Sequence, residues 1–509
     1  MAGESFDDEI LVAGVWRRGA GEVLETSDPA TGEVLARLHG ADAGDVADAV
    51  VGAAEAAADP HWRSMPPHER ARYLTAIADG IAGRAGELAG LQTADTGKSI
   101  NETRALVASA EGTFRYFAAA LETMEDALTP PRGPYLTMSV HEPIGVVGAI
   151  TPWNSPIASD AQKIAPALAG GNGVVLKPAE WTPLVSLALG RLIMESGLPA
   201  GLVSVLPGPG RVTGEAIVRH PGVGKVSFTG GTDTGRRIGA VAAEKIMPVS
   251  LELGGKSPTI VFPDADLEQA VAGLLFGIFS SSGQSCVAGS RVFIHADVYD
   301  RVLDELVRRT EKLRVGPGAD PETQVAPLVT RAHRDRVAAM VDRARDEGAR
   351  VLCGGRVPEG GVYDGGAYYL PTILDGLPNS AATCQEEIFG PVLVALPFRD
   401  EDDLVAQAND TVYGLACGRI RGARRFGGAR RFGGARRFGG ALPRDAGQTA
   451  SVAGAAVSTT SSECSSLASS RASCLRSVSD SPASIRRSLA KCSSTTRSVT
   501  FMPWSVSRA

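Results

Sequence analysis

Short apolar runs alternate with helical stretches through the middle of this chain. Between residues 146 and 253, runs of four to seven apolar residues are separated by stretches with helical spacing. Continuous apolar runs are typical of strands buried on both faces, and their alternation with helices predicts a parallel sheet covered on both sides. The predicted strands are residues 146–150, 173–176, 203–208, 225–230 and 248–253, and the predicted helices are residues 161–169 and 183–196. The fold class is therefore α/β, and nucleotides bind such sheets at the carboxyl ends of the strands.

The flanking parts of the chain carry further strand and helix patterns. Residues 10–38 have the pattern of short strands broken by Gly and Asp-Pro turns, and Asp42 or Asp45 caps an alanine-rich helix. Longer amphipathic helices are predicted at residues 66–91 and 100–124. A second α/β lobe follows residue 253, with helices at 297–314 and 330–348 and strands at 351–353, 368–370 and 392–397.

The segment SSGQSCVAGSR places Cys286 among small residues and glycines, with no charge close before it. Gly283 and Gly289 allow a sharp turn and a close approach of the backbone to a ligand. The apolar run at residues 271–279 predicts a buried element that leads to the cysteine. By itself a free cysteine is more often a small core residue than a nucleophile, so this interpretation depends on the groups around it.

Two polar side chains at predicted strand ends supply what a catalytic thiol needs, a proton acceptor and a donor to developing negative charge. Glu252 lies at the end of the strand at 248–253, and a carboxylate in mostly apolar surroundings becomes a usable base near neutral pH. Asn154 lies in the turn after the strand at 146–150. Its neutral amide, together with the Cys286 backbone N–H, can hold an oxyanion.

A glycine pattern and a charged pair follow two other predicted strands. FTGGTDTG contains Gly230 and Gly235 at the start of a helix whose N–H groups can face a pyrophosphate. This pattern differs from G-x-G-x-x-G and is weak alone. Lys177 and Glu180 follow the strand at 173–176, where a carboxylate suits ribose hydroxyls and repels a 2′-phosphate. The pair therefore favours NAD over NADP, and an ordinary surface ion pair is the alternative.

Six motifs occur along the chain, namely TPWNSP, VVLKPAE, FTGGTDTG, LELGGKSP, GQSCVAGSR and EEIFGPV. In this order and at these separations they resemble the aldehyde dehydrogenase superfamily, and the resemblance extends from about residue 8 to residue 418. It implies a discontinuous Rossmann-type NAD-binding domain, 1–130 and 141–253, and a second α/β catalytic domain, 254–418. Residues 131–140, with a β-like segment, resemble part of the family's oligomerisation arm.

The resemblance also implies roles for residues. Cys286 is the implied nucleophile, Asn154 with the Cys286 amide the oxyanion donor, and Glu252 the base that deacylates a thioester through water. The implied reaction oxidises an aldehyde to a carboxylic acid, with hydride transfer to NAD, through a cysteine thiohemiacetal and a thioester. The implied cofactor contacts are Ile150, Thr151, Trp153, Lys177, Glu180, Gly230, Gly231, Gly235, Leu253, Glu387 and Phe389.

Several of these positions have a more specific counterpart in the family. Lys177 and Glu180 are similar to its adenosine-ribose contacts, Glu387 to the glutamate on the nicotinamide ribose, and Phe389 to the ring near the nicotinamide. Gly231 stands where many members have a serine, and Trp153 and Lys163 fall where residues shape the site. The polar residues expected near the substrate tunnel suggest tolerance of a polar aldehyde: Ser155, Ser159, Asp160 and Ser285.

Composition describes an ordinary globular chain with an unusual end. The 509 residues are 44% hydrophobic and 21% charged, and the acidic N-terminus is unlike a signal peptide, so we expect a cytoplasmic protein without membrane spans. Seven cysteines lie scattered without C-x-x-C spacing, so we expect neither a metal site nor a disulfide framework. We expect Cys353 and Cys384 to be buried and inert.

Residues 419–509 differ from the rest. They hold 16 of the 51 Lys and Arg residues against three acids, contain GARRFGG repeats, and have 19 serines after residue 450. This composition predicts a disordered tail. Arg-Phe-Gly repeats can contact nucleic acid, but a shifted reading frame is the interpretation we favour, and a nucleic-acid partner is not expected.

The tail also bears on assembly and activity. A relative would continue with a strand that closes the catalytic lobe and pairs with a neighbouring subunit, so the family homo-oligomer is doubtful here. The alternative to an active enzyme is a catalytically impaired or non-folding relative that retains at most dinucleotide binding.

Overall fold

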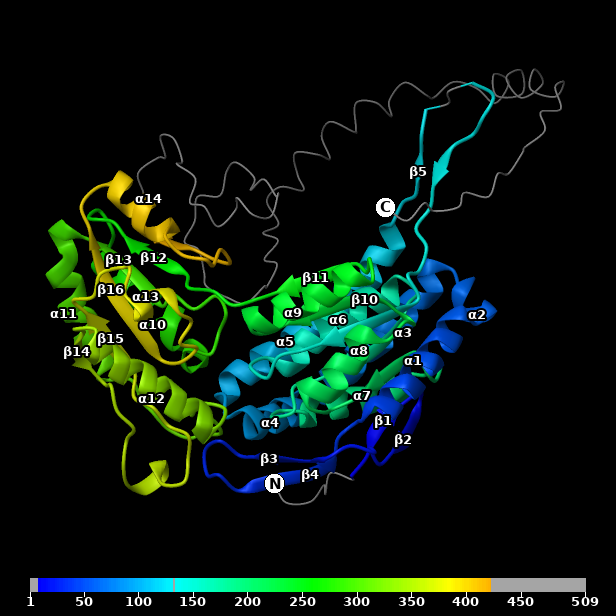
Figure 1. Cartoon of the computed structure of the whole chain (residues 1–509), viewed down its shortest axis with the longest axis horizontal. Coiled ribbons are helices and arrows are strands. Elements are labelled where there is room, and N and C mark those ends of the chain that lie inside the picture. Colours follow the sequence, from blue (N-terminus) through cyan, green and yellow to red (C-terminus); the bar gives the residue numbers. More distant parts are fainter. Residues whose placement is uncertain (1–7, 131–132, 423–509) are drawn as a thin grey trace, which may run out of the picture. The chain divides into compact units, whose positions relative to one another are not determined.

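Two sheets, each covered by helices, make up the described part of the chain (Figure 1). The computed structural model describes residues 8–130 and 133–422. Two further pairs of strands form small antiparallel sheets, β3 (Val23–Ser27) with β4 (Val34–His39) and β5 (Ala127–Leu128) with β6 (Met138–Ser139). No helix in the described ranges is both long and apolar enough to cross a membrane.

The first sheet has seven strands in the order β11-β10-β7-β8-β9-β1-β2. Five of them are parallel, as the sequence predicted, and β1 joins β9 in antiparallel orientation. The strands are β1 (Ile10–Val12), β2 (Val15–Arg17), β7 (Val146–Ile150), β8 (Gly173–Lys177), β9 (Val203–Val205), β10 (Val223–Thr229) and β11 (Val249–Glu252).

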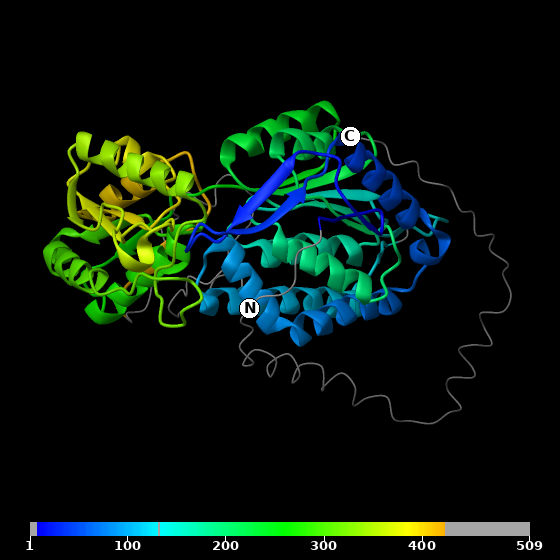
Figure 2. The ribbon, with the colours of Figure 1, turned by 90° about the horizontal axis from the view of Figure 1, so that it is seen from below.

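Helices cover both faces of this sheet, as Figure 2 shows. Within β7, Val147 and Ala149 pack into one apolar cluster while Val146 and Ile150 pack into the other, so alternate residues are buried on opposite faces. This explains the continuous apolar runs. Helices on one face are α3 (Pro67–Gly83), α4 (Ala85–Thr96), α5 (Ile100–Thr123), α6 (Pro156–Ala169) and α7 (Leu184–Glu195), and those on the other are α1 (Ala43–Ala58), α8 (Glu215–Arg219) and α9 (Thr232–Glu244).

Two details of the N-terminal helices resolve or correct the sequence analysis. Asp42 is the N-cap of α1, and Asp45 completes a capping box with it. The helix predicted at 66–91 is two helices, because Arg84 leaves helical geometry between α3 and α4. The short elements beside these helices are α2 (Pro60–Arg63) and the π-helical turn η1 (Gly210–Gly214).

The second sheet has six strands in the order β14-β15-β16-β13-β12-β17. All neighbours are parallel except β14 and β15. The strands are β12 (Pro258–Val261), β13 (Arg291–His295), β14 (Arg350–Cys353), β15 (Thr372–Asp375), β16 (Val392–Phe398) and β17 (Gly418–Ile420). Its helices are α10 (Leu267–Phe279), α11 (Tyr299–Thr310), α12 (Arg331–Asp346), α13 (Ala382–Gln385) and α14 (Glu401–Asn409), with short turns η2 (Ser280–Gly283), η3 (Ala296–Val298) and η4 (Gly361–Tyr363). The α/β fold class with a second α/β lobe is confirmed.

The strand predicted at residues 368–370 is wrong. Tyr368 and Tyr369 are both buried outside any strand, and β15 begins only at Thr372. Pro371 lies between them and the strand, and proline cannot donate a ladder hydrogen bond. The helix predicted at 297–314 is also shorter, because the turn η3 precedes α11.

The start of the tail also needs correction, because residues 419 and 420 belong to the fold. In β17, Ile420 pairs with Val261 and packs against the apolar cluster under α10 and α11. The guanidinium carbons of Arg419 and Arg421 lie 4.7 and 5.1 Å from the ring centroid of Phe262. Cation–π contact and strand pairing therefore extend the ordered sequence beyond residue 418. The tail predicted to be disordered otherwise lies outside the described residues, from residue 423 on.

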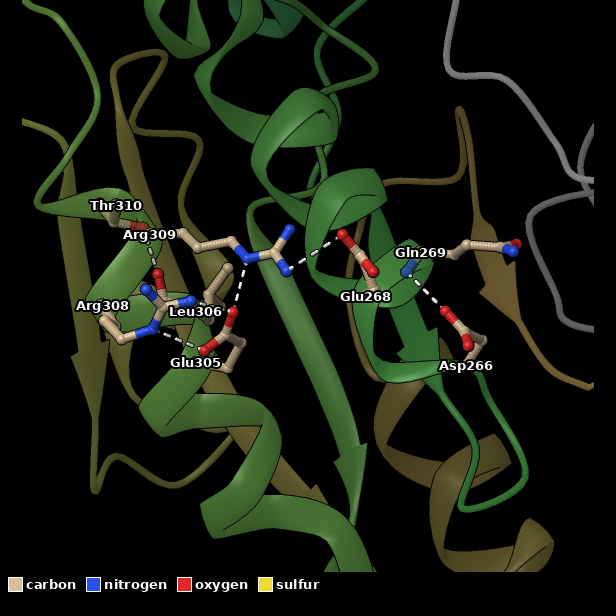
Figure 3. Close-up of polar contacts among 8 residues, drawn as sticks. All are labelled: Asp266, Glu268, Gln269, Glu305, Leu306, Arg308, Arg309 and Thr310. Atoms are coloured by element: carbon tan, nitrogen blue, oxygen red, sulfur yellow. Dashed lines mark hydrogen bonds and ion pairs between the residues drawn. The ribbon is translucent and has the colours of Figure 1, made fainter.

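Helix α10 leads directly to the cysteine segment and is tied to α11 by a surface ion-pair network (Figure 3). The Glu305 carboxylate accepts hydrogen bonds from Arg308 at 2.7 Å and from Arg309 at 2.6 Å. These bonds lower the pKa of Glu305 to about 2. Arg309 also lies 3.8 Å from Glu268 on α10, and Asp266 caps α10 through the Gln269 N–H. An exposed pair of this kind contributes little energy to the packing of the two helices.

Candidate active site

The candidate residues of the first sheet lie at the carboxyl ends of adjacent parallel strands. Ile150 pairs with Lys177 of β8 on one side and with Phe228 of β10 on the other. Thr229 of β10 pairs with Glu252 of β11. The strand ends are therefore level, and the segments that follow them lie along one edge of the sheet. This is the edge at which open α/β sheets bind ligands.

The turn after β7 contacts the cysteine segment of the second lobe. The Asn154 side-chain amide donates a hydrogen bond of 2.9 Å to the carbonyl of Gln284, two residues before Cys286. An amide nitrogen carries two protons, so one remains for another acceptor. Gln284 is itself buried, and its side-chain oxygen accepts from the Val329 N–H at 2.9 Å. Asn154 and the cysteine segment are thus brought together.

Cys286 is half-buried and closely surrounded by backbone. A Cβ added at Gly255 would overlap the Cys286 carbonyl oxygen, and one at Gly283 would overlap the carbonyl oxygen of Gly390. Burial raises the pKa of the Cys286 thiol, and the carboxylates of Glu387 and Glu252 raise it further. The thiol is therefore mainly protonated near neutral pH and needs a base to become a nucleophile.

The two carboxylates near the thiol differ in their surroundings. Glu252 is exposed at the end of β11, so the expectation of mostly apolar surroundings is wrong. Glu387 is partly buried, and its carboxylate accepts from the Gly255 N–H at 3.0 Å. Burial raises the pKa of Glu387. The fully buried Lys256 donates to the Glu386 carbonyl at 2.6 Å and so fixes the turn that carries Glu387.

An aromatic group joins the Asn154 turn to the Glu387 turn. The rings of Trp153 and Phe389 lie 5.2 Å apart in edge-to-face contact. Phe389 has a positive φ of 58°, which is unusual for an aromatic residue. Its carbonyl lies 2.8 Å from His333 Nε2 on α12. His333 was not identified from the sequence, because no local pattern shows that α12 meets this turn.

The glycine segment after β10 leaves room beside the start of α9. Gly231 is the N-cap of α9, and a Cβ there would meet nothing within 4 Å. Gly235 packs directly against Leu253, so its lack of a side chain lets α9 approach β11. The hydroxyl of Thr232 is buried without a hydrogen-bond partner. An unsatisfied donor beside free N–H groups fits an anionic group such as a pyrophosphate.

The charged pair after β8 is a direct contact. Lys177 is buried and donates to Glu180 at 3.2 Å and to the Pro178 carbonyl at 2.7 Å. Burial lowers the pKa of Lys177, and the Glu180 carboxylate opposes that shift. Glu180 keeps part of its carboxylate in solvent, where a hydroxyl-bearing ligand can reach it.

Of the four polar residues expected near the substrate tunnel, only some lie where they could line it. Ser285 lines a small cavity with Glu387, Phe389 and Gly390, and the Ser155 and Ser159 hydroxyls lie 3.0 Å apart. Asp160 does not face an open site. It is fully buried and accepts from Ser186 at 2.5 Å, and burial raises its pKa to about 6.

Lys163 connects this region to the sheet. Its ammonium donates to the Ser227 hydroxyl of β10 at 3.1 Å. Burial lowers the pKa of Lys163 to about 8, while the charges of Glu252 and Asp160 act in the opposite direction.

Comparison with known proteins identifies the family of this chain. The sequence profile described as "Aldehyde dehydrogenase family" matches residues 16–424. The chain belongs to the aldehyde dehydrogenase family. The match starts later and ends later than the resemblance between residues 8 and 418, in agreement with the inclusion of β17 in the fold.

Individual relatives agree with this assignment. DhaS of Bacillus subtilis (strain 168), whose name places it among the aldehyde dehydrogenases, is 43% identical over 400 residues, which are 78% of this chain and 80% of DhaS. An NAD+ complex of an aldehyde dehydrogenase from Bacillus cereus is 38% identical, with a TM-score of 0.79 over 81% of this chain and 84% of that one. A Burkholderia cenocepacia structure named for the same family is 39% identical, with a TM-score of 0.79 over 82% of this chain and 85% of that one.

The raised thiol pKa predicts a pH-dependent alkylation of Cys286. Only the thiolate reacts, so the rate with iodoacetamide should rise with pH through a midpoint above the free-cysteine pKa of about 8.5. Glu387→Gln removes a neighbouring negative charge, which favours the thiolate, and should move the midpoint to lower pH. Peptide mapping by mass spectrometry isolates the rate at Cys286. An unchanged midpoint in this variant would contradict the proximity of the two groups.

Proposed function

We propose that this aldehyde dehydrogenase oxidises an aldehyde to a carboxylic acid, with NAD as hydride acceptor and Cys286 as nucleophile. The proposal rests on one observation, that three segments of the chain meet around Cys286. Asn154 donates to the Gln284 carbonyl, and Gly255 lies against Cys286 and Glu387. These contacts bring an amide donor and two carboxylates to the vicinity of one thiol. Such a set fits covalent catalysis at a carbonyl carbon.

In the proposed reaction, the Cys286 thiol loses its proton to solvent through the exposed Glu252 carboxylate, and the resulting thiolate adds to the aldehyde carbon. The carbonyl oxygen becomes an oxyanion that accepts from the second Asn154 amide proton and from the Cys286 N–H. Bound NAD supplies the acceptor for the hydride that leaves this tetrahedral carbon. Glu252 then takes a proton from water, whose oxygen attacks the thioester and releases the acid and the thiol. The exposure of Glu252 supports this role, because a base for water must be reached by water.

The first lobe offers the groups to hold NAD. The open space at Gly231 and the unsatisfied Thr232 hydroxyl suit a pyrophosphate, and Lys177 with Glu180 suits the adenosine ribose. Glu387 and Phe389 suit the nicotinamide end, since both lie on the turn beside Gly255 and Trp153. Ile150, Thr151, Gly230, Gly235 and Leu253 would form the floor between them.

Activity of the full chain tests the proposal directly. NADH formation should be detected by its absorbance when the protein is given NAD and a panel of apolar and polar aldehydes. We expect polar aldehydes to be accepted, because Ser285 lines the cavity beside Glu387. Well-folded protein that turns over no aldehyde would refute the proposal.

A second candidate function is dinucleotide binding without turnover. It is favoured by the end of the family match at residue 424 and by the alignment with DhaS, which covers 80% of DhaS. NAD titration by calorimetry together with the absorbance assay separates the two functions. Cytoplasmic location remains a prediction.

Glu180 should determine the preference for NAD over NADP. Glu180→Gln removes the charge that repels a 2′-phosphate and weakens the bond to a ribose hydroxyl. We expect the KM for NAD to rise about tenfold and the ratio of kcat/KM for NADP to that for NAD to increase. Glu195→Gln is the matched control, because Glu195 is a surface residue paired with Arg84 at the end of α7. Equal effects of the two substitutions would contradict the role of Glu180.

A further inference from the structure

The first turn of α5 contacts the segment that leads to Cys286. The Ser281 backbone N–H donates to the Glu102 carboxylate, across 179 positions of sequence. The same turn is fixed to the second lobe by two other bonds. The Ile100 N–H donates to the Gly318 carbonyl and the Asn101 amide donates to the Pro321 carbonyl, both at 2.8 Å. Glu102 is therefore presented from a helix end that is already anchored.

The segment that Glu102 contacts has an unusual backbone. Ser281, Ser282 and Gly283 have φ values of 54°, 53° and 72° in succession. Left-handed geometry is readily adopted by glycine but is unfavourable for serine. It persists only where the surroundings hold it. The Ser282 hydroxyl donates to the Ala326 carbonyl at 2.6 Å, and the Ser281 N–H has the Glu102 carboxylate as its acceptor.

Three further features surround Glu102. Lys98 is only 3% exposed, and the Glu102 charge opposes the lowering of its pKa by burial. Glu102 lies in the first turn of α5, where the helix dipole favours a negative charge. The Ser99 hydroxyl accepts from the Glu102 backbone N–H at 3.4 Å and caps that turn.

We propose that Glu102 is a positioning residue for Cys286, holding the strained Ser281–Gly283 segment by a charge-assisted hydrogen bond from the other lobe. The proposal rests on the proposed function of Cys286 as nucleophile. Gly283 packs against the Gly390 carbonyl and Gln284 receives the Asn154 amide, so a shift of this segment moves Cys286 relative to both neighbours. Glu102 itself touches no reacting atom.

The test compares Glu102→Gln, the double variant Glu102→Gln/Ser281→Gly, and the control Glu111→Gln in the full chain. Glutamine has nearly the same shape as glutamate but no charge, so the hydrogen bond from the Ser281 N–H weakens while α5 itself is preserved. We expect kcat to fall roughly 10-fold to 100-fold, with the KM for NAD changed less than twofold, about the scatter expected of a neutral substitution. Ser281→Gly relieves the left-handed strain and should restore most of kcat.

Glu111 provides a matched control, since it lies on the same helix and pairs with Arg115 on the surface. Glu111→Gln should leave kcat unchanged. A general loss of stability in Glu102→Gln would affect kcat and NAD binding together and would not be relieved by a glycine at position 281. The kinetic split and the rescue therefore separate positioning from a purely structural role.

The rate of Cys286 alkylation at fixed pH keeps the inference testable without turnover. A released segment exposes the thiol, so Glu102→Gln should be alkylated several-fold faster and the double variant at the original rate. If the parent protein oxidises no aldehyde, the proposed function fails while this measurement still decides the positioning. Unchanged kcat and alkylation in Glu102→Gln, or a double variant no better than the single one, would overturn it.

Discussion

Cys286→Ala should abolish aldehyde oxidation while leaving NAD binding intact. Without a thiol no covalent adduct forms, and the loss of a nucleophile that acts with its base reduces kcat by on the order of 10⁴-fold or more. The substitution removes one sulfur from a half-buried position, so the fold should persist. The measurement combines NADH formation with calorimetric titration of NAD and circular dichroism.

A second thiol in the same lobe provides the control. Cys384 is fully buried, and burial raises its pKa to about 11. Cys384→Ala should cost about 1 kcal/mol of stability through the small cavity it leaves, with kcat unchanged. Retained turnover in Cys286→Ala, or its loss in Cys384→Ala, would transfer the nucleophile role away from Cys286.

Gly255→Ala should also lower the rate strongly, although it removes no functional group. Its Cβ would overlap the Cys286 carbonyl oxygen and would meet the Leu415 Cβ at 3.5 Å. The clash is with backbone, which cannot rotate away, so Cys286 or the strand end after Glu252 must move. A displacement of about 1 Å in a catalytic group lowers the rate roughly 100-fold. The Gly255 N–H also donates to Glu387, so the KM for NAD should rise as well.

Gly112→Ala separates this effect from the general consequences of adding a methyl group. Gly112 lies within α5, and a Cβ there would meet nothing within 4 Å. Alanine in a helix interior is more favourable than glycine by about 1 kcal/mol, so this variant should melt at a slightly higher temperature with the same kcat. If Gly255→Ala retained full activity, the close packing against Cys286 would not matter for catalysis.

Local patterns predicted the parallel strands of the first sheet most clearly at β7 and β8, which are buried at every residue and mostly apolar. Two elements were predicted incorrectly. Helical periodicity continues through Arg84, yet the chain breaks there between α3 and α4. The two tyrosines before Pro371 are buried without forming a strand.

In the candidate site, too, some features could be predicted from the sequence and others could not. Cys286, Asn154 and Glu252 were predicted as site residues because each lies in a recognisable motif near a strand or helix end. The exposure of Glu252 could not be predicted, because a strand pattern describes which residues face each side of the strand and not what lies beyond its end. His333 contacts the Phe389 carbonyl and Glu102 the Ser281 N–H, and no sequence near either residue encodes such long-range bonds.

The order of the strands along the chain has a consequence during synthesis. Every strand of the seven-stranded sheet lies between Ile10 and Glu252, and every strand of the six-stranded sheet lies between Pro258 and Ile420. The first sheet can therefore be completed on the ribosome before the second is translated. A coding change late in the gene then acts on the cysteine-bearing half of a molecule whose first sheet is already formed.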